Sequence, residues 1–215
     1  MSRAGISWSR VTGSTVATFA SAARAFATLV RELPASGWDG QGLGEWDLRA
    51  LVGHASRSLI TVSSYLQATA DHEDVTSAVD YYVKIRDYAS NLGAADIVER
   101  GRQAGRDLGA DPAAAVDGLV DRVLPEVDAA GDPLITVIGG LGIRLSNYVP
   151  TRTFELAVHG LDIARASGVD LVLPDDVLSE ATALAARIGV ALGQGEPILL
   201  TLTGRSTLPD SFSVV

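Results

Sequence analysis

The stretch from residue 149 to residue 168 carries the side chains best suited to chemistry, a glutamate and a histidine four residues apart. On an α-helix, positions i and i+4 are surface neighbours, so Glu155 and His159 can reach one small target. Arg152 and Asp162 fall on the same stripe, one turn to either side, and are candidates for supporting that pair or for binding a substrate. Carboxylate and imidazole groups are common metal ligands, so the stripe predicts part of a divalent metal site.

Two ligands hold a metal ion poorly, so a third must come from elsewhere in the chain. His54 lies on a second predicted helix, which Asp47 opens as an N-cap. Its neighbours along that helix are the small or polar residues Ala50, Ser58 and Thr61, which leave room for something to approach. Two histidines and one carboxylate leave coordination positions open, as in catalytic zinc sites, and also suit Fe(II), Ni(II) or Mn(II). The sequence singles out no catalytic acid or base.

A simpler interpretation of the same stripe is open at this point. The polar residues can be only the solvated face of an amphipathic helix whose buried face holds Phe154, Val158 and Leu161. His72 lies among carboxylates in the acidic turn 71–75, and we expect it to be solvated and to have no role in a site. The two interpretations differ in whether the polar stripe is buried.

The composition narrows the function classes. The 215 residues contain no cysteine, which excludes disulfides, thiolate metal ligands and a thiol nucleophile of the protein's own. A net charge of −9 argues against nucleic acid and membrane surfaces as partners. The first residues lack the apolar core of a signal peptide, and no apolar run reaches the roughly 18–20 residues of a bilayer span. We therefore expect a cytoplasmic protein.

Apolar periodicity and capping residues predict a mainly α chain. The predicted helices cover residues 14–33, 48–70, 76–91, 94–108, 112–130, 149–168 and 175–192. Short β-like runs follow at 134–140 and 196–215. Strands and helices do not alternate, so a parallel nucleotide-binding sheet is excluded.

Two motifs carry a family resemblance: W-D-x-R-x-L-V-x-H at 46–54 and R-x-x-E-x-x-x-H-x-x-D at 152–162. Together they resemble the DinB-like/YfiT-like metalloenzyme superfamily and, within it, the N-terminal domain of mycothiol-dependent maleylpyruvate isomerases. The resemblance covers roughly residues 10–195 and implies an antiparallel four-helix bundle, which we assign to residues 1–195. The β-like run at the end of the chain predicts a short β-rich C-terminal extension at 196–215. It also implies that His54, Glu155 and His159 bind a divalent metal, usually zinc.

The same resemblance implies a small thiol such as mycothiol as cosubstrate. The predicted function is then a metal-dependent thiol S-transferase or isomerase that acts on a small electrophile. Larger members carry a separate C-terminal domain that helps to form the active site, and residues 198–215 are too few for it, although Arg205 could reach the site as an anion clamp. The alternatives are a non-catalytic metal-binding bundle, possible as a homodimer, and a metal hydrolase that uses no thiol.

Overall fold

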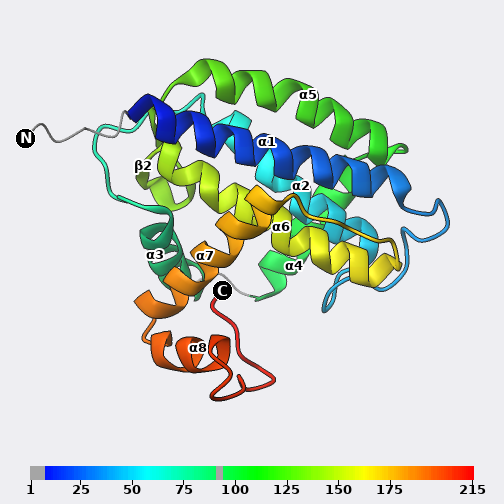
Figure 1. The fold of residues 1–215 in the computed structure, drawn as a ribbon. Helices are drawn as coiled ribbons and strands as arrows, with labels where there is room; N and C mark the ends of the chain where they lie inside the picture. Colours follow the sequence, from blue (N-terminus) through cyan, green and yellow to red (C-terminus); the bar gives the residue numbers. More distant parts are fainter. Residues whose placement is uncertain (1–7, 91–93) are drawn as a thin grey trace, which may run out of the picture.

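The computed structural model describes residues 8–90 and 94–215, and these form eight α-helices and one small sheet (Figure 1). The helices are α1 (Trp8–Glu32), α2 (Leu48–Tyr65), α3 (Ala78–Ser90), α4 (Ala94–Asp107), α5 (Pro112–Ala130), α6 (Leu145–Ser167), α7 (Asp175–Ala191) and α8 (Gly195–Leu202). The predicted mainly α class is confirmed. The predicted bundle range also included residues 1–7 and 91–93, which lie outside the described residues. None of the described helices is long and apolar enough to cross a membrane.

Helices α1, α2, α5 and α6 form a four-helix bundle around one apolar core (Figure 1). Arg31, near the end of α1, pairs with Asp117 near the start of α5, so these two helices run in opposite directions. The long connection that contains α3 and α4 returns the chain to the end of the bundle at which α2 begins. Helix α5 therefore runs in the same direction as α2. One long crossover of this kind is a known variant of the four-helix bundle.

A small hairpin joins α5 to α6 and ties both helices to the end of α2. Strands β1 (Leu134–Thr136) and β2 (Gly142–Arg144) pair antiparallel, with Ile135 opposite Ile143. The loop after α2 adds a bridge on each side, Thr69 to Ile135 and Val75 to Ile143. The hairpin therefore fixes how α2 and α6, the two helices with the predicted ligands, lie against each other.

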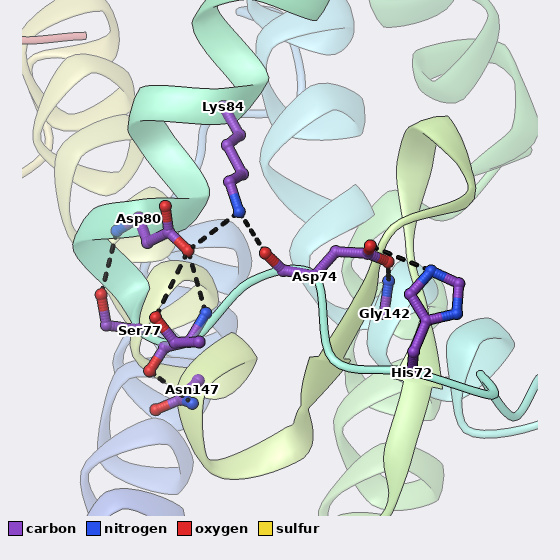
Figure 2. A network of polar contacts seen from close by, with 8 residues as sticks. His72, Asp74, Ser77, Asp80, Lys84, Gly142 and Asn147 are labelled. Atoms are coloured by element: carbon purple, nitrogen blue, oxygen red, sulfur yellow. Dashed lines mark hydrogen bonds and ion pairs between the residues drawn. The ribbon is translucent and has the colours of Figure 1, made fainter.

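Polar contacts hold this loop in place (Figure 2). The Asp74 carboxylate accepts a hydrogen bond of 2.7 Å from the backbone N–H of Gly142, and the Lys84 ammonium donates to the Asp74 carbonyl. Lys84 also pairs with Asp80 at 3.3 Å on α3, and Asn147 on α6 donates to a carbonyl of the loop. A side chain on Gly142 would overlap the backbone of the loop, so glycine is required there. The loop, the hairpin and α3 are thus one connected unit.

Glycines allow α4 to approach α2 closely. A Cβ on Gly53 would overlap the backbone of Gly105, and one on Gly101 would overlap the indole of Trp46. The Trp46 indole N–H donates to the carbonyl of Val98 at 2.9 Å. The glycine-dotted segment 94–108 therefore has two faces: its polar side chains are exposed, and its small residues pack on α2 and hold Trp46 in position.

The predicted β-rich extension at 196–215 is wrong, because these residues form no strand: α8 covers their first part and irregular backbone the rest. Helix α8 packs on α7, where Gly189 leaves room for Ile198 and Val214. Short apolar runs cannot be assigned to helix or strand by periodicity alone. Here packing against α7 decides in favour of a helix, and the two strands found among the described residues lie in the hairpin instead.

Candidate metal centre

His54 lies on α2, whose first turn is fixed by its N-cap. The Asp47 carboxylate accepts a hydrogen bond of 2.7 Å from the backbone N–H of Ala50, as predicted. The imidazole lies between two rings, with centroids 4.4 Å from Trp46 and 4.8 Å from His159. Its Nδ1 is buried and has no hydrogen-bond partner among the described residues. A buried nitrogen without a partner is costly unless something binds it.

Glu155 and His159 lie one turn apart on α6, and the Glu155 Oε2 atom is 3.3 Å from the His159 Nε2 atom. Only 23% of the glutamate side chain and 14% of the histidine side chain are exposed, and Thr151 on the same face is fully buried. The interpretation of this stripe as a solvated helix face is therefore wrong. The polar side chains point into the packed interior between α2, α3 and α6.

Two further side chains hold this pair. The Tyr82 hydroxyl on α3 donates to the Glu155 Oε1 atom at 2.7 Å. The His159 Nδ1 atom lies 3.3 Å from the Asp162 Oδ2 atom, so Asp162 contacts the imidazole directly. Carboxylates that bind the far nitrogen of a histidine fix its orientation and make it a better metal ligand.

The pKa values of the three residues follow from this geometry. Burial, and next the charge of His159, lower the pKa of His54 to about 4, so its imidazole is neutral at neutral pH. Burial opposes a charge on His159, but hydrogen bonds to Asp162 and Glu155 outweigh it and raise the pKa of His159 to about 9. Burial also opposes a charge on Glu155, but the His159 hydrogen bond and the Arg152 charge lower the pKa of Glu155 to about 2. In the metal-free protein a proton on His159 therefore balances the buried carboxylate.

The three predicted ligands come together in space. His54, Glu155 and His159 each offer one ligand atom, these atoms lie within 4.8 Å of one another, and this is the one such group in the described part of the chain. Two imidazole nitrogens and a carboxylate oxygen suit a divalent ion. The buried Nδ1 atom of His54 is consistent with a role as a metal ligand, because no described residue forms a hydrogen bond with it.

A pocket of about 200 Å³ opens beside His54 and Glu155. Its wall is formed largely by two arginines and four tyrosines, which are Arg57, Arg152, Tyr65, Tyr81, Tyr82 and Tyr148. Ser58 and Thr61, the small neighbours noted in the sequence, also line it. The pocket gives a small molecule access to the region of the candidate ligands.

Arg152 lies in this pocket. Its guanidinium carbon lies 4.9 Å from the ring centroid of Tyr148 and 5.5 Å from that of Tyr81, and it forms no ion pair with Glu155 in the described structure. Arg205, in contrast, is exposed, and its guanidinium donates to the carbonyl of Thr203 in its own turn. Arg205 is therefore a turn residue, and it lies outside the pocket.

Sequence reasoning missed the aromatic residues of the site. Trp46 stands in the first motif, but its stacking on His54 depends on α4, which the motif does not contain. Tyr82 lies 73 residues before Glu155, and no spacing rule connects them. The one available signal was the pair of tyrosines at 81–82 in a segment with few other aromatics.

The structure is thus a four-helix bundle with a His/Glu/His group on two facing helices. A family model described as the mycothiol maleylpyruvate isomerase N-terminal domain matches residues 19–164, and the chain belongs to this family within the DinB-like superfamily. The family assignment made from the two motifs is thus confirmed. No match was found among curated proteins or among solved structures.

Proposed function

We propose that this protein is a divalent-metal-dependent enzyme that uses a small thiol of the mycothiol type to act on a small electrophile, as an S-transferase or isomerase. The observation that carries the proposal is the buried His54, Glu155 and His159 group beside an accessible pocket. Membership of a family described by mycothiol and maleylpyruvate isomerisation supports the choice of thiol. Zinc is the proposed metal, and nickel, iron or manganese would suit the same ligands.

Each part of the site has a role in this proposal. A divalent ion there would keep a bound thiol deprotonated at neutral pH and so supply a nucleophile that the cysteine-free chain lacks. His54, Glu155 and His159 would hold the ion, with Asp162 and Tyr82 fixing the orientation of two of these ligands. The pocket walls would hold the electrophile and exclude water from it.

Two outcomes are open for the electrophile. In a transferase, a sulfur–carbon bond forms. With an activated alkene the C=C π bond is consumed and the adjacent carbon takes a proton, and with an epoxide the C–O bond breaks and its oxygen takes the proton. In an isomerase, the thiol adds to a double bond, the former double bond rotates, and elimination returns the thiol. Maleylpyruvate itself is one candidate substrate for the second outcome. We expect the reaction to take place in the cytoplasm, and a homodimer is compatible with it.

The test begins with elemental analysis of protein purified without chelators or a histidine tag, beside a His54→Ala variant. We expect one equivalent of metal, lost in the variant. Protein with bound metal is then assayed with mycothiol and with activated alkenes and epoxides. Turnover that needs both metal and thiol supports the proposal, and turnover without thiol indicates a metal hydrolase. If no metal binds after reconstitution, the bundle has a non-catalytic role.

A further inference from the structure

A groove of about 1180 Å³ runs between α1 and α5, which lie side by side in the bundle (Figure 1). It shares no lining residue with the pocket beside the candidate metal centre, and the proposed function uses none of its side chains. The α1 wall of the groove is built largely of small residues, which are Gly13, Ala17, Ala20, Ala27 and Thr28. The groove is therefore a second surface feature, and its charges indicate what it binds.

The two walls of the groove carry opposite charges. The charged residues of the α1 wall are Arg24 and Arg31, and those of the α5 wall are Asp117, Asp121 and Asp128. Arg31 pairs with Asp117 across one end of the groove. Arg24, Asp121 and Asp128 are exposed and form no ion pair in the described structure. A basic wall and an acidic wall thus lie next to each other and neutralise each other only in part.

The Arg31–Asp117 pair shows which residues of the two walls lie at the same height. The two helices run in opposite directions and rise about 1.5 Å per residue. Arg24 lies as far before Arg31 as Leu124 lies after Asp117, so Arg24 is level with Leu124. Asp121 and Asp128 come about one turn to either side of this level.

Pro125 adds a hydrogen-bond acceptor at the same height. It lies inside α5 and lines the groove, and its nitrogen carries no hydrogen. The carbonyl of Asp121 therefore lacks the helical hydrogen bond that residue 125 would otherwise donate. A guanidinium placed over this turn meets two carboxylates and a carbonyl, and it has enough N–H donors for all three.

A second copy of this chain offers the complementary surface. In a two-fold dimer the same patch of both copies makes contact, so each contact from residue i to residue j is repeated from j to i. A two-fold axis along the groove lays α1 of each copy on α5 of the other, and opposite charges meet. An axis across the groove lays α1 on α1 and α5 on α5, and like charges meet. The charges therefore favour the axis along the groove.

We propose that α1 and α5 form the interface of a two-fold dimer, in which Arg24 of one copy lies between Asp121 and Asp128 of the other. This contact occurs twice by symmetry, and the small residues of α1 let the helices approach closely. Along the 19 residues of α5, two helices roughly 10 Å apart present on the order of 500–600 Å² of flat area per copy. Side-chain relief raises this area toward the roughly 800 Å² per partner of a standard interface.

The test measures the mass of the untagged protein in solution by sedimentation velocity over a range of concentrations. We expect a dimer with twice the 22.4 kDa mass of one chain. Arg24→Asp, and separately the double variant Asp121→Arg/Asp128→Arg, place like charges in contact. Each should raise the dissociation constant of the dimer by roughly tenfold to a hundredfold. Arg187→Asp is the matched control because Arg187 is exposed on α7 and lies outside the groove.

Mixing the two groove variants tests the register directly. In a mixed dimer the new carboxylate of one copy meets the new arginines of the other, and the unchanged arginine meets the unchanged carboxylates. Native mass spectrometry of an equimolar mixture should therefore show the mixed dimer in preference to a dimer of either variant alone. The substituted residues are exposed, and circular dichroism reports whether each variant folds.

A wild type that stays monomeric at every concentration would overturn the proposal and leave the groove to another partner. A dimer that Arg24→Asp leaves unchanged or tightens would also overturn it, because the interface would then lie elsewhere or the axis would run across the groove. Failure of the mixed dimer to form would contradict the pairing of Arg24 with Asp121 and Asp128. The inference does not rest on the proposed function, since none of the altered residues lines the pocket beside the candidate metal centre.

Discussion

Two regions of this protein place a histidine beside carboxylates, and they differ in almost everything else. In the acidic turn, the His72 Nε2 atom lies 3.1 Å from the Asp74 Oδ1 atom, yet 78% of the His72 side chain is exposed. In the candidate metal centre, the His159 side chain is 14% exposed and His54 approaches it from another helix. The turn is the more acidic segment, but only the bundle supplies buried ligands from two rigid elements. Rigid, buried placement rather than local acidity marks the candidate site.

The largest effect on metal content is expected when one histidine is removed from each of these two regions in turn. In His159→Ala two ligands remain, so metal content should fall from about one equivalent to nearly none while helical content persists. The matched change His72→Ala should leave metal content unchanged, because that side chain is solvated. Elemental analysis and circular dichroism of both variants provide the measurement. Metal retained in the first variant, or lost in the second, would reverse the assignment of the two regions.

A smaller effect on metal affinity is expected when the hydrogen bond from Tyr82 to Glu155 in the candidate metal centre is removed. Tyr82→Phe removes the hydroxyl that donates to Glu155 at 2.7 Å, and metal affinity should fall about 10–100-fold. Tyr65→Phe is the control, since Tyr65 lines the same pocket but makes no hydrogen bond to the three ligands in the described structure. Competition with a chromogenic chelator measures both affinities. Equal affinities for Tyr82→Phe and the wild type would show that the hydroxyl does not support Glu155.

The electrostatics of the buried pair predict a pH dependence in the metal-free protein. The pKa of His159 is about 9 in the folded state against 6.5 when unfolded, so its proton stabilises the fold fully below pH 6.5. This contribution, about 1–3 kcal/mol, is lost as the pH rises through 9. The pKa of His54 shifts the other way, to about 4, so its contribution is present above pH 6.5 and is lost as the pH falls toward 4.

Urea unfolding in the presence of a chelator, at several pH values from 6.5 to 9.5, measures the His159 contribution. The wild type should lose stability over this range relative to His159→Gln, which lacks the titrating group. Parallel curves for the two proteins would contradict the strong coupling of His159 to Glu155 and Asp162.

Much of the local structure could be predicted from the sequence. Asp47 caps α2 as expected, and the four-residue spacing places Glu155 and His159 on one face of α6. These features are local, and local rules of capping and periodicity suffice for them. The approach of His54 to the pair depended on the family resemblance, because no residue pattern reports how two helices one hundred positions apart pack together.

What could not be predicted depends on tertiary packing. Tyr82 reaches Glu155 only because the crossover lays α3 against α6, and Trp46 covers His54 only because Gly101 admits its ring. The apolar run in 196–215 is compatible with a strand by composition, but Ile198 packs into the space at Gly189 as part of a helix. In each case a contact between distant residues decides the outcome.

The smallest effects are expected in the acidic turn, which we interpret as a structural clasp (Figure 2). His72→Ala should change the free energy of unfolding by less than about 0.5 kcal/mol, because an exposed ion pair contributes little. Asp74→Ala removes the acceptor for the Gly142 N–H and should cost about 1 kcal/mol. Neither variant should alter metal content, and urea unfolding with elemental analysis measures both properties. A loss of metal in Asp74→Ala would contradict a purely structural role for the acidic turn. It would mean that the turn also sets the positions of α2 and α6 that bring His54 close to Glu155.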